Sequence, residues 1–274
     1  MQLQPGVLVI AGILSLALIV LPLGLPLWGR LLLIVTMPAW LGPIVIRFRQ
    51  TQPRSAEFAP IGSSAPAAVP ASFDATRETL ATHGFVEIGR LEQTNSNRGM
   101  AGVVQLLEHP NSYAVCSRLV IANPASDQLL ADLVVFLTER TAGPTLVTSN
   151  ATIIAPFPPN PRFDTVWFPD VRDPAKLYAL HGARVAQPGA GGPRRTTVAS
   201  HPVDYQARLE TASKEHMVRC GYWWLDEDNR VYRPTWKGAI LMALRSLPPC
   251  RQLIRWQRTR RAAAVGPSLA RHAS

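Results

Sequence analysis

The chain opens with a long apolar stretch and then changes to short apolar runs separated by polar turns. A helix needs about 20 mostly apolar residues to cross a bilayer. Two runs near the N-terminus, residues 6–21 and 31–46, come close to that length. The segment between them, residues 22–30, contains prolines and glycines that interrupt a helix. The pattern therefore predicts an N-terminal transmembrane helical hairpin over residues 1–49.

Other interpretations of the apolar stretch stay open. A cleaved signal peptide requires a basic first segment, and residues 1–5 contain no Lys or Arg. A single crossing followed by an interfacial segment is the stronger alternative, because Pro38 and Pro43 interrupt the second run. The third alternative is a buried helical hairpin of a soluble domain, which the length of the apolar stretch disfavours.

Arginines at the ends of the stretch predict its orientation. Positively charged residues near membrane ends stay on the cytoplasmic side. Arg47, Arg49 and Arg54 follow the second run, whereas the predicted turn has only Arg30. Arg30 and Trp28 suit a turn at the level of the lipid headgroups. We therefore expect a hairpin in the inner (cytoplasmic) membrane and the remainder of the chain in the cytoplasm.

Residues 73–248 show the pattern of an α+β domain. Residues 50–72 before them are rich in Pro, Ala and Ser and predict a linker. Apolar runs separated by short turns favour an antiparallel β-meander, here flanked by helices. The predicted strands cover residues 85–93, 103–107, 113–122, 129–139, 145–154 and 163–168. The predicted helices cover residues 74–82, 174–186, 203–219 and 239–247, and we expect the third of them to be largely exposed.

Capping residues locate two helix ends. His83-Gly84 is a typical helix stop, and Asp173 followed by Pro174 is a typical helix start. Both signals are local, so they predict boundaries without reference to the rest of the fold.

A second hairpin near the C-terminus is unusually aromatic. An acidic loop, residues 226–229, separates two extended runs. The aromatic residues of these runs are Tyr222, Trp223, Trp224, Tyr232 and Trp236. We expect their rings to pair across the strands as packing. The alternative is a binding surface for apolar or sugar-like groups, or a belt at the membrane interface.

Positive charge is concentrated at the C-terminus. The chain has a formal net charge of +10, and residues 245–274 hold seven Lys or Arg and no Asp or Glu. A tail of this kind, residues 249–274, fits an amphipathic or disordered segment on an anionic lipid leaflet better than a folded surface for specific nucleic-acid binding. The predicted membrane-interface residues are Trp28, Arg30, Arg47, Arg49, Arg251, Arg255, Trp256, Arg258, Arg260 and Arg261.

Reactive chemistry leaves no recognisable trace in the sequence. It contains no glycine-rich phosphate loop, no metalloprotease motif and no serine-nucleophile motif. Three cysteines occur without metal-ligand spacing. His109 and Cys116 fall on neighbouring strands without a third group to orient them. We therefore assign no catalytic, cofactor-binding or metal-binding residue and expect no cofactor.

These observations favour a membrane-anchored, non-catalytic interaction or binding protein. Its expected partners are the anionic leaflet of a lipid bilayer and a protein that the sequence does not identify. An enzyme acting on lipid-linked or apolar substrates is the first alternative, and it requires a pocket that joins His109, Cys116 or His181 to carboxylates. The second alternative is a peripheral lipid-binding module that uses the aromatic hairpin and the basic tail.

Overall fold

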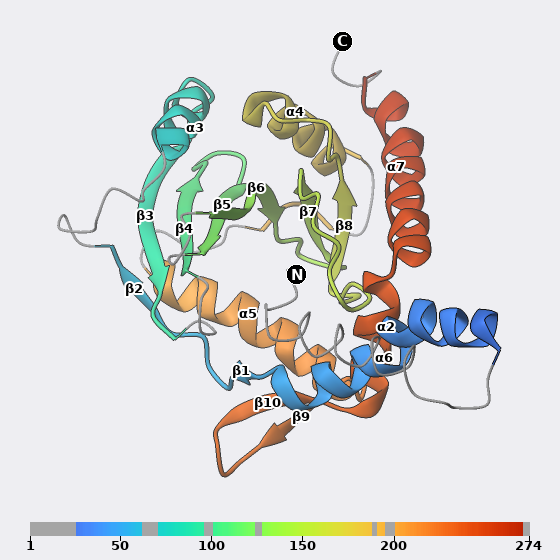
Figure 1. Cartoon of the computed structure of the whole chain (residues 1–274). Helices are drawn as coiled ribbons and strands as arrows, with labels where there is room; N and C mark the ends of the chain where they lie inside the picture. Colours follow the sequence, from blue (N-terminus) through green and yellow to red (C-terminus); the bar gives the residue numbers. More distant parts are fainter. Residues whose placement is uncertain are drawn as a thin grey trace.

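A computed structural model of the chain shows an α+β fold with a large sheet, a small sheet and six helices among the described residues (Figure 1). It describes residues 26–61, 71–95, 101–123, 128–187, 191–194 and 201–270. The first predicted membrane run, residues 6–21, lies outside this part.

The large sheet has seven strands in sequential order. They are β2 (Phe58–Pro60), β3 (Val86–Gln93), β4 (Ala101–Glu108), β5 (Val115–Asn123), β6 (Gln128–Thr138), β7 (Thr145–Ser149) and β8 (Phe163–Trp167). Every neighbouring pair is antiparallel except β7 and β8. This agrees with the predicted meander up to β7. The proline-rich segment at residues 150–162 carries the chain back to the start of β7, so β8 enters in parallel.

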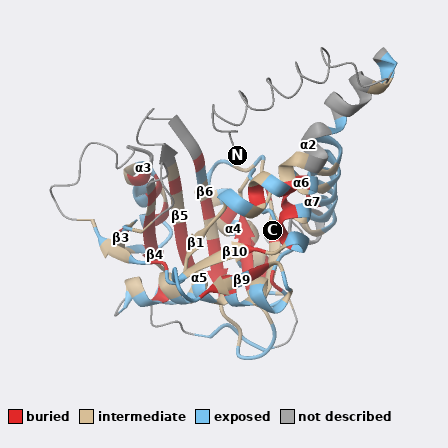
Figure 2. Cartoon of the chain, turned by 60° about the horizontal axis from the view of Figure 1, so that its bottom comes forward, coloured by how far each residue is buried: buried red, intermediate tan, exposed pale blue. Residues whose placement is uncertain are grey.

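Each face of the large sheet has its own apolar core. On one face, Leu107, Phe136 and Leu177 belong to a buried cluster that joins the strands to α3 (Ala71–Ala81) and α4 (Pro174–Val185). On the other face, Leu106 and Tyr205 belong to a cluster that joins the strands to α5 (Pro202–Arg219). The alternation of side chains along a strand produces this division. Figure 2 shows the buried residues concentrated along the strands.

The two capping signals are confirmed. Asp173 accepts a hydrogen bond from the Ala175 N–H, and Pro174 is the first residue of α4. At the end of α3, Gly84 has a φ of +84°, and the N–H of Phe85 donates to the Leu80 carbonyl at 3.1 Å. This is the hydrogen bond by which a left-handed residue closes a helix end.

Helix α5 differs from its prediction as an exposed helix. It lies across the second face of the large sheet (Figure 1) and buries Tyr205 and Lys214. The prediction rested on its few large apolar residues. Partly buried Leu209 and Val203 complete a short contact with the strands, so a small apolar stripe is sufficient for docking.

The predicted linker at residues 50–72 is corrected in its first part. Within it, β1 (Gln52–Pro53) pairs with β10 (Val231–Pro234), and β2 pairs with β3. Edge pairing needs only backbone N–H and C=O groups, so it leaves no hydrophobic period in the sequence. The small sheet has the order β1-β10-β9, in which β9 covers Trp223–Asp226.

The predicted tail, residues 249–274, is also more ordered than expected. The long helix α7 (Pro248–Ala270) follows directly after α6 (Trp236–Ser246). Ala262 and Val265 pack against the core cluster beside α4. Small apolar residues spaced for one helix face therefore dock the second half of α7 on the domain.

The second predicted membrane run is the helix α2 (Leu27–Arg49). Its last turns contact α6, and Ile46 is buried in a cluster with Met242 and Ala243. A Cβ added to Gly42 would lie 3.4 Å from the Ala243 Cβ. Small residues thus let the two helices approach closely, and this end of the predicted membrane segment packs against protein. Among the described residues, we find no helix that has both the length and the apolar character to cross a bilayer.

Candidate functional site

Helix α6 has one buried face and one exposed apolar face. Ala239, Met242 and Ala243 face the protein interior. On the opposite side, Trp236, Ile240 and Leu244 follow one another at intervals of four residues, and all three are exposed. Residues at this spacing lie on one side of a helix, so the exposed face is a continuous apolar row.

Helix α2 extends this row. Exposed Ile44 and Phe48 lie one turn apart at its C-terminal end, and the Phe48 ring meets the Trp236 ring edge-on at a centroid distance of 6.3 Å. We call the set Ile44, Phe48, Trp236, Ile240 and Leu244 the α2–α6 apolar surface. Large apolar groups gathered in this way on a protein surface are typical of an interaction site.

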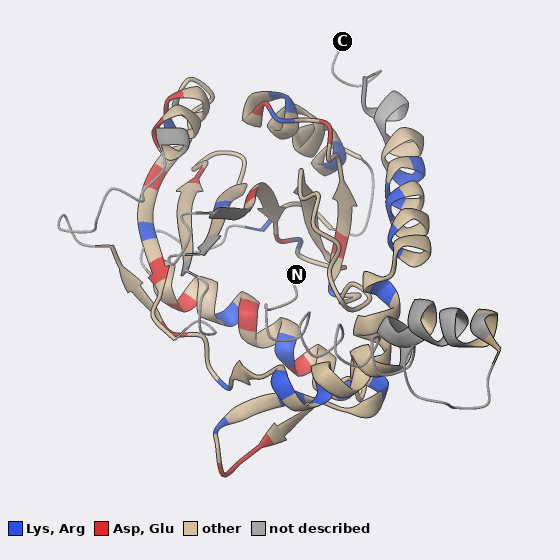
Figure 3. Cartoon of the chain, viewed as in Figure 1, with Lys and Arg blue, Asp and Glu red and all other residues tan. Residues whose placement is uncertain are grey.

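Positive charge surrounds the apolar surface. Helices α2, α6 and α7 together contain ten Lys or Arg and no Asp or Glu. Figure 3 shows the cations along α7 and around the C-terminal end of α2. Arg47 lies over the Trp224 ring at 5.8 Å, and Arg260 lies over the Trp256 ring at 4.7 Å. Cations and aromatic rings at a polar–apolar boundary suit a lipid headgroup region.

Most of the predicted membrane-interface residues lie on the outside of these helices. The exposed ones are Trp28, Arg49, Arg251, Arg255, Trp256 and Arg260. Arg47 is half-buried where it contacts Trp224. The side chain of Arg30 is outside the described part of the structure. The remaining two, Arg258 and Arg261, form contacts within the domain.

Arg258 attaches α7 to the domain. Its side chain is 8% exposed, lies over the Trp167 ring at 4.2 Å, and donates a hydrogen bond to the Ile153 carbonyl at 2.8 Å. Burial and the charge of Arg245 lower the pKa of Arg258 to about 10. Arg261 pairs with Asp164 at 2.7 Å. These two arginines therefore hold α7 on β8. Arg258 is too buried to reach lipid, whereas Arg261 stays exposed beside its partner.

The aromatic hairpin is present as predicted, between β9 and β10, but its rings do not pair across the strands. Trp224 lies opposite Arg233, and Tyr232 lies opposite Leu225. Tyr222 instead stacks on Phe157 at 5.1 Å. The rings pack against the segments that flank the hairpin because the register places a non-aromatic residue opposite each aromatic residue of the two strands.

The five hairpin aromatics therefore do not form one surface. Trp223 is buried in the cluster that holds α2 and α6. Tyr222 and Tyr232 are partly buried beside it. Only Trp224 and Trp236 are exposed, and Trp236 belongs to the α2–α6 apolar surface. The binding surface expected on the hairpin thus shifts onto the neighbouring helices.

The candidate reactive residues are held by packing. Cys116 is fully buried, and burial raises the pKa of its thiol. His109 packs edge-on against Phe85 at 5.2 Å, and its Nδ1 accepts the backbone N–H of Ser112 at 3.1 Å. His181 lies between two threonine hydroxyls. These contacts account for the three residues without a catalytic role, and the described structure shows no carboxylate bonded to any of them.

Sequence reasoning identified α6 as an apolar helix but missed that one of its faces stays open. The spacing of Trp236, Ile240 and Leu244 was a usable signal. Burial of the opposite face depends on α2, which is distant in sequence. No protein-family model, curated protein or solved structure gives a significant match to the chain. Inference about function therefore depends on the geometry of the chain itself.

Proposed function

We propose that the chain is a membrane-anchored, non-catalytic binding protein whose α2–α6 apolar surface rests on an anionic lipid leaflet. The observation that supports this most strongly is the exposed row Trp236, Ile240 and Leu244 beside Phe48, on helices that carry only positive charge. A basic helical face with exposed aromatic and aliphatic groups is the pattern of an interfacial segment.

Two physical contributions support docking on lipid. Transfer of the exposed apolar side chains into the acyl boundary removes them from water. Each Lys or Arg near an anionic leaflet contributes about 1 kcal/mol. Arg49, Arg251 and Arg255 are exposed cations on these helices. Together the two contributions favour an anionic bilayer over a neutral one.

The N-terminal stretch supplies the firm anchor in this proposal. In this proposal the two apolar runs insert as a hairpin up to the last turns of α2, where Gly42 and Ile46 pack on α6 instead. The cations after the second run keep the α+β domain on the cytoplasmic side of the inner membrane. The domain then lies close to the leaflet, because α2 leads directly into the α2–α6 apolar surface. In this position it is available to a protein partner.

Thermal unfolding in nanodiscs tests the docking of the domain. The full chain is inserted in phosphatidylcholine discs with or without phosphatidylglycerol, so the anchor is present in both. Docking stabilises the folded domain by linkage. We expect the unfolding midpoint to rise by several degrees in the anionic discs, since 1 kcal/mol shifts a domain of this size by about 2–4 °C.

A matched pair of variants locates the effect. Ile240→Glu places a charge in the α2–α6 apolar surface, and Val86→Glu places one on another exposed apolar residue, in β3. The two residues are 46% and 60% exposed. We expect Ile240→Glu to lose at least half of the rise in unfolding midpoint that anionic discs produce, and Val86→Glu to retain this rise. A rise that is absent, or equal in both variants, contradicts the proposal.

A further inference from the structure

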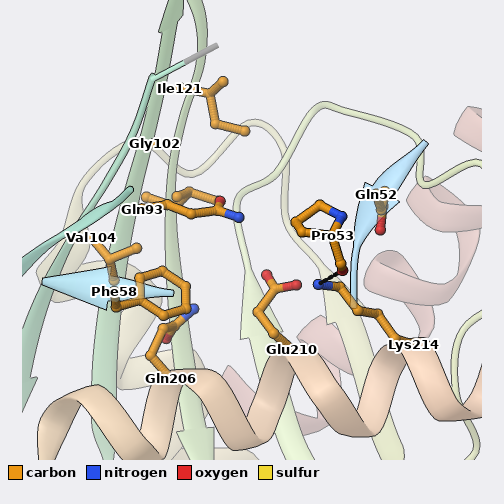
Figure 4. Close-up of a pocket in the computed structure, with 11 residues that line it drawn as sticks. Gln52, Pro53, Phe58, Gln93, Gly102, Val104, Ile121, Gln206, Glu210 and Lys214 are labelled. Carbon is orange, nitrogen blue, oxygen red and sulfur yellow. Dashed lines mark hydrogen bonds between the residues drawn. The ribbon is translucent and has the colours of Figure 1, made fainter. Parts of the chain in front are cut away.

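A cavity of about 230 Å³ lies between α5 and the large sheet, separate from the α2–α6 apolar surface. Figure 4 shows the side chains that reach into it from the helix, the strands and the segment that contains β1 and β2. The volume is well above the roughly 30 Å³ share of one water, and it is below the about 300–1,000 Å³ of pockets for drug-sized ligands. A ligand of this cavity therefore has to be small.

The walls of the cavity differ in character. The strands and β2 supply an apolar wall of Phe58, Val104, Leu119 and Ile121. Helix α5 supplies a polar floor of Gln206, Glu210 and Lys214. The floor residues are spaced by four, so they lie along one side of the helix. In Figure 4 their side chains rise from α5 toward the strands.

The polar floor contains unused hydrogen-bonding capacity. The Oε1 atom of Gln206 is buried and has no hydrogen-bond partner among the described residues. Lys214 is 6% exposed, and its ammonium donates to the Pro53 carbonyl at 3.1 Å. Burial lowers the pKa of Lys214, while the Glu210 charge acts in the opposite direction. A buried acceptor without a donor is unfavourable, so this arrangement favours a ligand that completes it.

We infer that this cavity binds a small zwitterion with an apolar side chain, such as an apolar amino acid. The ammonium of the ligand would donate to the Glu210 carboxylate, and also to Gln206 Oε1 after that side chain rotates toward the cavity, because the atom is closed to a water-sized group in the present rotamer. Its carboxylate would accept from Lys214, one turn further along α5. Its side chain would pack on the apolar wall formed by Phe58 and Val104. A zwitterion offers an ammonium to Glu210 and a carboxylate to Lys214, whereas an ion of one sign is attracted by only one of these two charges.

Binding of L-leucine to the full chain in detergent micelles tests the site by calorimetry. The same titration uses 4-methylpentanoate, which lacks the ammonium, and 3-methylbutylamine, which lacks the carboxylate. Each analogue loses at least one charge-assisted hydrogen bond that L-leucine would form in the cavity. We expect L-leucine to bind and each analogue to bind at least about tenfold more weakly. The absence of binding by both L-leucine and L-phenylalanine overturns the inference, as does equal binding of the analogues.

Two variants place the binding in the cavity. Gly102 lines it, and an added Cβ there would meet only Gln93 at 3.7 Å, an ordinary contact. Gly102→Leu therefore fills the cavity without a backbone collision. Gly192→Leu is the control, because nothing lies within 4 Å of a Cβ at that position. We expect the affinity for L-leucine to fall about tenfold or more in Gly102→Leu and to stay unchanged in Gly192→Leu. Wild-type affinity in a folded Gly102→Leu chain contradicts the site.

A third variant keeps the test decisive if Gly102→Leu does not fold. Lys214→Met retains the buried stem and removes the donor, so L-leucine binding should weaken while binding of 3-methylbutylamine stays the same. Equal loss for both ligands rules out the assigned role of Lys214. These outcomes do not depend on lipid, so they are separate from the test of membrane docking.

Discussion

At the residue scale, the buried polar groups of α4 show how the fold uses polar side chains for packing. The two ring nitrogens of His181 lie 2.9 Å from the hydroxyl oxygens of Thr138 and Thr148. Arg184 donates to the Val147 carbonyl at 2.6 Å and pairs with Asp164 at 3.0 Å. Since each buried polar group has a partner, α4 docks on the sheet without the desolvation cost of unsatisfied groups.

This network predicts a pH-dependent stability. Burial, with a smaller contribution from Arg184, lowers the pKa of His181 to about 3, whereas a histidine in the unfolded chain has a pKa of about 6.5. Between these values the unfolded chain binds more protons, so the stabilisation is complete above about pH 6.5 and decreases as the pH falls toward 3. The slope is at most about 1.4 kcal/mol per pH unit.

Urea unfolding at pH 7.5, 6.0 and 5.0 measures this effect. The wild-type chain should lose stability over this range, and His181→Gln should lose less because it removes the titrating group. Carboxylates titrate in both chains, so their contribution cancels when the free energies of unfolding of the two chains are subtracted. Identical slopes for the two chains would show that His181 is not held in its neutral form.

At the scale of elements, the junction between the aromatic hairpin and α6 depends on a glycine. The Thr235 hydroxyl caps α6 by accepting the N–H of Gly238 at 3.1 Å, and the Thr235 backbone N–H donates to the Tyr222 carbonyl. A Cβ at position 238 would collide with the same Tyr222 carbonyl oxygen. The helix therefore starts against the hairpin at a distance that only glycine permits.

Substitution of Gly238 by Ala should destabilise this junction. The collision involves backbone, which cannot rotate away, so we expect a loss of about 1–3 kcal/mol, as in overpacked sites. Gly182→Ala in α4 is the matched control, since nothing lies within 4 Å of its added Cβ. An alanine there should be neutral or stabilising by up to about 1 kcal/mol. Chemical denaturation compares the two, and equal stabilities would refute the close approach.

Local signals explain which elements could be predicted from the sequence. Asp173-Pro174 and Gly84 determine helix ends through neighbouring residues, and both predictions hold. The pairing of Gln52 with Tyr232 joins segments 180 residues apart, and no nearby residue encodes it. The same reason hid the open face of α6. The spacing of Trp236, Ile240 and Leu244 places them on one helix face, but only the packing of α2 on Ala243 shows that this face is the open one.

At the scale of the whole molecule, the large sheet positions two unrelated sites. One face is covered by α3, α4 and α7, while α5 lies on the other and leaves the polar cavity beside Phe58. Helices α2 and α6 pack together at the side of the domain and carry the exposed apolar residues. Figure 3 shows Lys and Arg on and near these helices. This arrangement allows one surface to rest on lipid while the cavity stays accessible.

Fluorescence quenching in nanodiscs tests membrane docking most directly. A single reporter dye is attached at Ile240→Cys or at Val86→Cys in the full chain, with Cys220→Ser and Cys250→Ser, while buried Cys116 stays unlabelled. Brominated lipids quench only dyes that reach the acyl region. The proposal predicts strong quenching at position 240 in anionic discs and little at position 86. Equal quenching at the two positions, or none at position 240, would contradict it.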